Sequence, residues 1–242
     1  MSLPPKRLHD ALAATWPRLE TFAVGPFTLR NGAGGGKRVS AATLDGPYSD
    51  EALEKAEAAL VERGLPKLFM IRDGECTLDR ALGARGYSIV DPTLFYTAPI
   101  ETIAEKPRPL SLLDCWPPLA LQKQIWRDAG IGQPRLDVMA RASKPRTAFI
   151  ARFQNRAAGV AFAALDGDLA MLHALEIEPS FRRQGVARYM VRGIADWAAA
   201  RGAAWLALTV TERNIAARGL YSALGMTEAG HYHYRQAAED AP

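Results

Sequence analysis

Cysteine is scarce in this sequence of 242 residues, and long apolar runs are absent. Cys76 and Cys115 are too few for a disulfide framework, and neither has the spacing of a metal-ligand motif. The longest apolar run, Ala157 to Leu165, is too short to span a bilayer. The segment from Met1 to Trp16 is broken by prolines and charged residues, unlike a signal peptide. We therefore expect a reduced, cytoplasmic protein without a metal site or membrane contact.

Runs of like charge are also missing. Lys and Arg number 30 and Asp and Glu 26, which gives a formal net charge of +4, and the basic residues are scattered. We expect no nucleic-acid partner, although a basic balance favours anionic ligands. Hydrophobic residues at 48% and charged residues at 23% are ordinary for a globular protein, and the length allows one large or two small domains.

The stretch from Leu169 to Ala187, LAMLHALEIEPSFRRQGVA, predicts a strand, a turn and the start of a helix. The first amides of such a helix have no partner within it, and with the helix dipole they attract an anion such as a diphosphate. Gly185 lets a phosphate approach the backbone, and Ala187 keeps the first turn uncrowded. This stretch therefore predicts an anion-binding helix terminus.

Arg182-x-x-Gly185-x-Ala187 matches the acyl-CoA-binding signature of the GNAT N-acetyltransferase superfamily, and Leu175-x-Ile177-x-Pro179 precedes it at the superfamily's spacing. On these motifs the chain resembles that family from about Pro109 to Arg235. The resemblance implies acetyl-CoA as cosubstrate, with its pantetheine arm paired to the strand backbone like an added strand. The residues expected around the cofactor are Leu175, Ile177, Arg182, Arg183, Gln184, Gly185, Val186, Ala187 and Asn214.

Acyl transfer to an amine needs a base that removes the amine proton. His173 is one candidate, because an imidazole titrates near neutrality, but a histidine in an apolar strand is often a hydrogen-bonded core residue. Glu176 is the rival candidate, and strand alternation predicts that it points away from the face of His173, Leu175 and Ile177. Glu178 is a further rival, which we interpret as a turn carboxylate because it stands just before Pro179. The choice of base stays open at the level of sequence.

The leaving thiolate benefits from an acid, and the resemblance implies that this is Tyr221. In the family a tyrosine at this place, seven residues after Asn214, reaches the CoA sulfur, while the asparagine contacts the cofactor. The alternative is a tyrosine that packs beside its helical neighbours. Neither cysteine lies where an acyl-enzyme nucleophile is expected, which favours direct attack in a ternary complex.

A repeated spacing divides the chain. Gly64 to Tyr96 and Gly202 to Tyr234 both span 32 residues, with strand and helix patterns in the same order. The proline-rich segment 101–109 is typical of a linker. We therefore predict a degenerate GNAT-like domain at 1–104, which lacks the acyl-CoA signature and shapes the acceptor side, and a catalytic GNAT domain at 105–242.

Local patterns add detail to this scheme. Residues 27–30 and 38–44 predict two strands around the glycine-rich stretch 31–37, interpreted as a hairpin loop because its spacing does not match a P-loop. Residues 87–90 and 93–97 predict two further strands, and residues 118–127 and 135–143 two helices. The predicted fold class is α/β, a mixed twisted sheet flanked by helices as in the GNAT acyltransferase fold, with a smaller α/β GNAT-like N-terminal domain.

The predicted function is transfer of an acetyl group from acetyl-CoA to a primary amine on a small molecule or a peptide. A non-catalytic acyl-CoA-binding module or sensor is the alternative from another class. No motif identifies the acceptor, the length of the acyl chain or the oligomeric state, for which a homodimer is one expectation.

Overall fold

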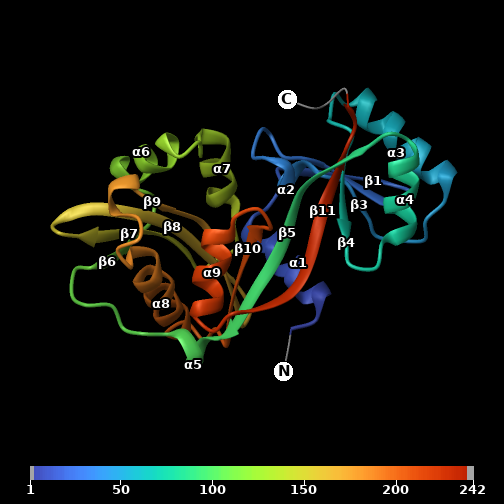
Figure 1. Ribbon diagram of the computed structural model, residues 1–242. Coiled ribbons are helices and arrows are strands. Elements are labelled where there is room, and N and C mark those ends of the chain that lie inside the picture. Colours follow the sequence, from blue (N-terminus) through green and yellow to red (C-terminus); the bar gives the residue numbers. More distant parts are fainter. Residues whose placement is uncertain (1–2, 239–242) are drawn as a thin grey trace. The chain divides into compact units, whose positions relative to one another are not determined.

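The computed structural model describes residues 3–238 (Figure 1). Within them the chain forms two compact parts, each discontinuous in sequence. The large part comprises residues 3–17, Phe95–Val210 and Asn214–Ala229, and the small part comprises residues 18–94, Thr211–Arg213 and 230–238. Strands β5 (Ser88–Pro99) and β11 (Thr227–Gln236) contribute residues to both parts.

The large part contains a mixed sheet with helices on both faces. Neighbouring strands are antiparallel from β6 (Leu112–Cys115) through β7 (Arg146–Phe153) and β8 (Arg156–Asp166) to β9 (Leu169–Ile177), whereas β9 and β10 (Trp205–Thr211) are parallel. Helices α6 (Ala120–Asp128) and α7 (Gln133–Arg141) lie on one side of strands β7 to β9, and α8 (Val186–Ala199) lies on the other (Figure 1). The strand order is β5, β10, β9, β8, β7, β6.

Apolar periodicity explains how α8 packs on this sheet. Met190 and Ile194 are fully buried, one turn apart, and the ring of Trp197 lies edge-on to Phe149 of β7 at 5.4 Å between centroids. Gly159 of β8 gives the helix room to approach, because a Cβ there would lie 3.2 Å from the sulfur of Met190. The predicted helix after Gly185 is therefore present, with its apolar face on the sheet.

Helix α1 (Pro5–Thr15) belongs to the large part although it comes first in the sequence. Its residues Leu8, Ala11 and Leu12 are buried, and α1 packs against β8 and β9. Arg7 donates to the carboxylates of Asp166 and Asp168 in the turn that joins these strands. Two short helices, α5 (Ile100–Ile103) and the 3₁₀ turn η1 (Pro179–Phe181), and α9 (Ile215–Ala223) complete this part.

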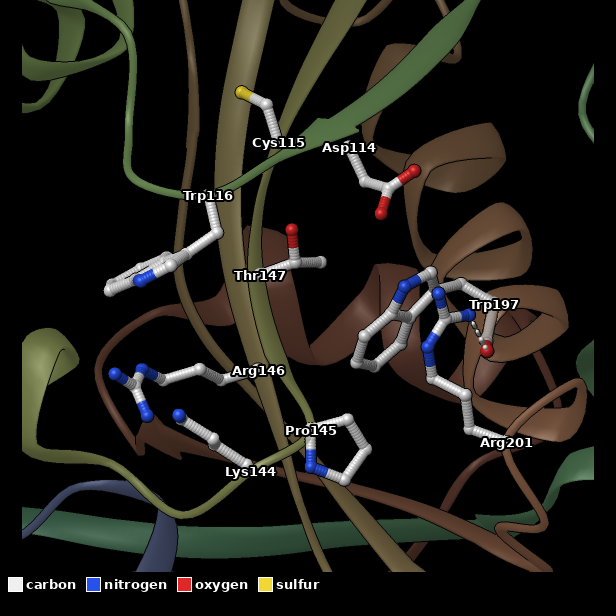
Figure 2. A pocket seen from close by; sticks show the side chains of 9 residues that line it. All are labelled: Asp114, Cys115, Trp116, Lys144, Pro145, Arg146, Thr147, Trp197 and Arg201. Carbon is white, nitrogen blue, oxygen red and sulfur yellow. Dashed lines mark hydrogen bonds between the residues drawn. The ribbon is translucent and has the colours of Figure 1, made fainter.

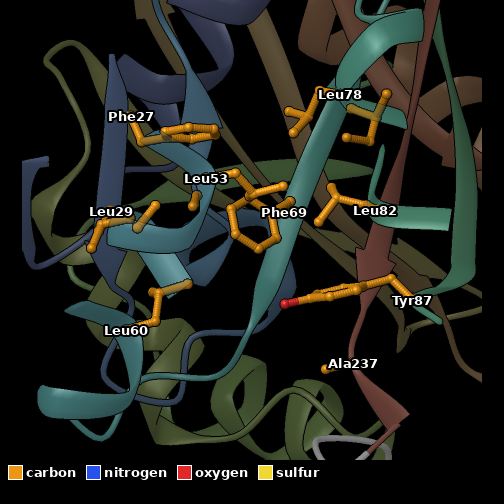
Figure 3. Close-up of a cluster of buried hydrophobic side chains, with 12 residues drawn as sticks. Phe27, Leu29, Leu53, Leu60, Phe69, Leu78, Leu82, Tyr87 and Ala237 are labelled. Carbon is orange, nitrogen blue, oxygen red and sulfur yellow. The ribbon is translucent and has the colours of Figure 1, made fainter. Parts of the chain in front are cut away.

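The small part has a core of its own (Figure 3). Phe69 of β4 (Leu68–Arg72) lies at its centre and contacts the rings of Phe27 and Tyr87 edge-on, while Leu53 and Leu60 cover it from α3. Its remaining elements are β1 (Glu20–Val24), β2 (Phe27–Asn31), α2 (Lys37–Ser40), β3 (Thr43–Leu44), α3 (Asp50–Glu62) and α4 (Cys76–Ala84). Strands β1, β2 and β3 form one sheet, and β4 pairs with β11, which neighbours β5.

Two predictions of strands were wrong. Residues 38–44 form the short helix α2 followed by only two strand residues, because Gly32 lets α2 fold back closely: a Cβ there would lie 2.4 Å from Ser40 Oγ. Residues 87–97 do not form two strands but lie mostly in the single strand β5, which tolerates a left-handed residue, Asp91 at φ +46°, near its start. The two helices predicted at 118–127 and 135–143 are present as α6 and α7.

The repeated spacing corresponds to a repeated order of elements. A glycine with positive φ follows each of α3, α8, α4 and α9, and a strand comes next in each case. The last strands of the two repeats are exchanged, because β11 pairs with β4 and β5 lies next to β10. The compact parts therefore do not follow one cut in the sequence. The division into domains 1–104 and 105–242 stays a prediction. Residues 1–2 and 239–242 of these two ranges lie outside the described residues.

Candidate active site

Strands β9 and β10 separate at their carboxyl ends. Their parallel register runs from Leu169 opposite Trp205 to Leu172 opposite Leu208 and ends there among the described residues. Strand β9 nevertheless continues to Ile177 and β10 to Thr211. Polar groups of an extended ligand can align with a strand that leaves its neighbour in this way. The sheet therefore has an opening beside the last residues of β9, which include the expected cofactor contacts Leu175 and Ile177.

A β-bulge lies in β9 at this opening. His173 is opposite Phe162 of β8 and Glu176 is opposite Val160, so that three residue steps on β9 match two on β8. Ala174 takes up the additional residue with φ +49°. Directly opposed residues share a face, and two steps along β8 return to the same face. His173 and Glu176 therefore lie on one face of the sheet.

The bulge shows that the prediction from simple alternation is wrong for His173. The side chain of Glu176 was expected to point away from those of His173, Leu175 and Ile177, but the bulge shifts the alternation by one residue between His173 and Glu176. Ile177 does point the other way, since a Cβ on Gly159 would touch both its Cδ1 at 2.7 Å and Met190 of α8. The face of Glu176 is thus the one opposite α8, on which α6 and α7 lie (Figure 1).

His173 is buried in a packed and hydrogen-bonded environment. Its Nε2 lies 2.9 Å from Thr15 Oγ1, and that hydroxyl donates its single proton to the carbonyl of Ala11 at 2.7 Å. Nε2 must therefore be the donor to Thr15. The rings of Trp16 and Phe162 lie 5.0 and 6.2 Å from the imidazole. This geometry joins α1 to the sheet and fits the alternative of a core histidine.

Glu176 has the surroundings of a proton acceptor. Its side chain is half-buried and forms no hydrogen bond or ion pair within residues 3–238. Burial raises the pKa of this carboxyl, and the positive charges of Arg182 and Arg135 partly offset the increase. A carboxylate that is poorly solvated and lacks a fixed partner is suited to take a proton from a bound amine.

Tyr221 is buried in α9 close to the same opening. Burial raises the pKa of its hydroxyl well above the ordinary value, and the negative charge of Glu176 raises it further. Its ring lies 5.8 Å from that of Tyr96, and its hydroxyl donates to no acceptor within the described residues. The phenol is therefore held in its protonated form, as an acid requires. Asn214 is the N-cap of α9, where its Oδ1 accepts from Ala217 N at 3.1 Å.

The N-terminus of α8 has the predicted geometry. Gly185 is its N-cap at φ +82° and is exposed, with open space where a Cβ would be. The first bond that closes the helix runs from Tyr189 N to Gly185 O, and the amides of Val186, Ala187 and Arg188 bond to no backbone acceptor among residues 3–238. Free amides at a helix N-terminus are suited to a diphosphate.

Side chains in the turn before α8 donate hydrogen bonds to backbone carbonyls nearby and so stabilise the turn. Arg182 Nε donates to the carbonyl of Ile177 at 3.1 Å, and Gln184 Nε2 donates to that of Ser180 at 2.9 Å. Arg183 is exposed with a left-handed φ of +62°. The groups of this turn that are suited to an anion are therefore backbone amides, and Arg182 and Arg183 add positive charge beside them.

A contact that sequence reasoning missed is that of Trp126. This fully buried residue of α6 donates its indole N–H to the carbonyl of Ala174, at 2.8 Å, in the β9 bulge. Nothing in the sequence indicates the contact, because the bulge itself has no sequence signal there: Ala174 is neither glycine nor asparagine. Arg135 of α7 was also not singled out, although its charge acts on Glu176.

A cavity of about 680 Å³ lies elsewhere in the large part (Figure 2). It is lined by the end of β6, the start of β7 and the last turn of α8, whereas the free amides are at the first turn of that helix. Arg146 and Arg201 stack on the rings of Trp116 and Trp197 at 4.9 and 4.4 Å. Its position at the other end of α8 separates this cavity from the candidate active site.

Within residues 3–238, no group of three or more His, Cys, Asp or Glu residues is arranged to hold a metal ion. No helix of that range is long and apolar enough to cross a lipid bilayer.

An opened parallel strand pair, followed by a turn and a helix with free amides, is a geometry suited to an extended anionic ligand that aligns with one strand. The family model described as the acetyltransferase (GNAT) family matches residues 105–226, half of the sequence. The chain belongs to this family and is an N-acetyltransferase. The family assignment and the fold class predicted from the sequence are thereby confirmed.

Known relatives support the assignment. An uncharacterized N-acetyltransferase of Bacillus subtilis (strain 168), YobR, is 25% identical over 243 residues, which cover 95% of this chain and 97% of that protein. The ribosomal protein bS18-alanine N-acetyltransferase of Salmonella typhimurium is 34% identical over 91 residues, 36% of this chain and 62% of that protein.

Solved structures agree in fold. A GCN5-related N-acetyltransferase from Kribbella flavida has a TM-score of 0.68 at 16% identity, over 97% of this chain and 95% of that one. A tandem GNAT protein from the clavulanic acid biosynthesis pathway has a TM-score of 0.59 at 11% identity, over 98% and 89%. These likenesses concern the fold alone.

Proposed function

We propose that the protein transfers the acetyl group of acetyl-CoA to a primary amine by direct attack in a ternary complex. The observation that carries the proposal is the opening between β9 and β10, with the free amides of α8 beyond it and Glu176 and Tyr221 beside it. The amides bind the diphosphate, and the backbone of Leu175 and Ile177 pairs with the pantetheine arm.

In this mechanism Glu176 is the base and Tyr221 the acid. Glu176 takes a proton from the bound ammonium, and the nitrogen lone pair then attacks the thioester carbonyl carbon. The C–N bond forms, the tetrahedral intermediate collapses, and the C–S bond breaks with its electron pair on sulfur. Tyr221 donates its proton to the departing thiolate, and the second proton that the nitrogen must lose to become an amide is taken up by the resulting tyrosinate, which restores Tyr221. His173, the other candidate base, instead holds α1 against β9 through Thr15.

A peptide α-amine is the first acceptor to test. The name of the Salmonella typhimurium relative describes an enzyme that acts on an alanine of a ribosomal protein. Purified protein should release free thiol from acetyl-CoA with at least one acceptor among a peptide with N-terminal alanine, a lysine peptide with a blocked N-terminus and small primary amines. Binding of acetyl-CoA without turnover on any acceptor would instead support an acyl-CoA-binding module or sensor, and absence of binding would refute both.

Replacing Tyr221 with Phe should lower kcat by about 100-fold, at the lower end of the range for proton transfer, because a thiolate leaves readily without complete protonation. Affinity for acetyl-CoA should stay unchanged in a calorimetric titration. Tyr189→Phe is the matched control, since that half-buried tyrosine of α8 donates its hydroxyl proton to the carbonyl of Arg152 at 3.1 Å and lies outside the proposed mechanism. Equal turnover by the Tyr221→Phe and Tyr189→Phe variants would reject the role of the acid.

We also propose that the small part binds no acetyl-CoA and shapes the acceptor side. Its sequence has no acyl-CoA signature before helix α4. Calorimetric titration should give one acetyl-CoA per chain, and two would refute this proposal. The cytoplasmic location and the homodimer stay predictions, the latter to be tested by sedimentation.

A further inference from the structure

We infer that Trp126 is a positioning residue, which holds the β9 bulge in place and thereby keeps Glu176 on the reactive face. The inference rests on the proposed function, since it assigns a task to a residue that lies behind the proposed base. Trp126 itself is fully buried and touches the strand through its indole nitrogen. Its part in the reaction is therefore indirect.

The bulge is a conformation that needs support. Ala174 has φ +49°, a region that residues with a Cβ rarely adopt, and the register to β8 is interrupted at this point. A bulge leaves its additional residue outside the regular ladder of hydrogen bonds. Ala174 has no partner in the register to β8, and its carbonyl accepts the indole N–H of Trp126 at 2.8 Å.

The position of helix α6 is itself fixed by hydrogen bonds, so the indole N–H of Trp126 is held in place as a donor. Gln122 in the first turn of α6 is fully buried, and its Oε1 accepts from Leu119 N at 2.7 Å and from the thiol of Cys115 at 3.1 Å. Cys115 is the last residue of β6. Helix α6 is thus hydrogen-bonded to β6 through Gln122 and to β9 through Trp126, and these two contacts fix its position relative to both strands.

The bulge decides where Glu176 points. With regular alternation from His173, Glu176 would lie on the α8 face, among the side chains that surround Met190. With the bulge, it lies on the face of α6 and α7, where Arg135 acts on it. A weaker bulge therefore displaces the carboxylate of Glu176, and small displacements of a catalytic group lower the rate strongly.

The test compares Trp126→Phe with Trp197→Phe. Both remove the same volume from a buried site, but the indole N–H of Trp197 has no hydrogen-bond partner among the described residues. Trp126→Phe should lower kcat about 10-fold, leave the KM for acetyl-CoA unchanged, and move the acidic limb of the pH profile of kcat/KM to lower pH, as the carboxylate becomes better solvated. Trp197→Phe should change neither kcat nor the profile.

Ala174→Gly provides a second variant that does not depend on how well Trp126→Phe folds. Glycine adopts φ +49° without strain, so the single variant Ala174→Gly should keep full activity. In the double variant Trp126→Phe/Ala174→Gly, the glycine should restore most of the kcat that Trp126→Phe loses. The inference is overturned if Trp126→Phe and Trp197→Phe have the same kcat and pH profile, or if Ala174→Gly restores nothing. An inactive Glu176→Gln variant beside an unaffected Trp126→Phe would reject the inference but keep the proposed function, whereas a fully active Glu176→Gln would reject the proposed base.

Discussion

Replacing Glu176 with Gln should lower kcat by about 1000-fold and leave the affinity for acetyl-CoA unchanged. The amide keeps the size of the side chain but cannot accept a proton from the amine. Because the carboxylate forms no hydrogen bond or ion pair within the described residues, its removal should break no contact that holds the fold. Steady-state kinetics with an acceptor identified by thiol release, together with calorimetry of acetyl-CoA binding, measures both quantities.

Glu178→Gln is the control for this variant. Glu178 lies two residues further along the chain, where it precedes the 3₁₀ turn, and its backbone N–H donates to the carbonyl of Ala158. It carries the same charge in the same neighbourhood but has no place in the proposed mechanism. Similar losses of activity in both variants would indicate a general effect of negative charge, and full activity of Glu176→Gln would remove it as the base.

The pH dependence follows from the direction of the pKa shift. Burial raises the pKa of Glu176 above that of an exposed glutamate, about 4.3, and the base is active only when ionised. Activity should therefore fall, as pH decreases, at a higher pH than an exposed carboxylate would give. A raised pKa also means that ionisation of Glu176 destabilises the fold as pH rises. Glu176→Gln should thus raise Tm at neutral pH, and the difference should vanish below about pH 4.

Local sequence signals predicted helix boundaries in both parts of the chain. The polar start and closing glycine of α3, the spacing of Met190 and Ile194 in α8, and the position of Gly185 each depend on neighbouring residues alone. Such signals are visible in a sequence because capping and amphipathic packing are short-range effects. The N-terminus of α8 could therefore be located to the residue.

Long-range effects were not predictable in the same way. The bulge at Ala174 arises where β9 meets β8 and Trp126 reaches across from α6, 48 positions earlier in the chain. For this reason the sequence wrongly predicted that Glu176 and His173 lie on opposite faces of the sheet. The exchange of β5 and β11 between the repeats is equally invisible in the sequence. The segment 101–109, predicted as a linker, follows the end of β5 but lies within the large part. Pairing partners of strands depend on tertiary structure.

Replacing Gly185 with Val should weaken acetyl-CoA binding by about 100- to 10,000-fold. Gly185 is exposed at φ +82°, beside the free amides of Val186 and Ala187, and a valine would place its branched side chain in the open space through which a phosphate approaches. Loss of two charge-assisted hydrogen bonds, each worth about 1.5–3 kcal/mol, gives an effect of this size. Calorimetry or competition with a fluorescent CoA analogue measures the change in Kd.

Gly202, at the other end of the same helix, provides the control. A substitution there causes backbone strain but does not affect contact with the ligand. Gly202 follows α8 at φ +86°, and it too is exposed with nothing within 4 Å of a Cβ. Gly202→Val therefore introduces the same left-handed strain, about 1–2 kcal/mol, without approaching the free amides. Both variants should lose similar amounts of thermal stability, and only Gly185→Val should lose acetyl-CoA. Equal Kd values in the two variants would mean that backbone strain in α8, and not access of the diphosphate to its first amides, sets the affinity.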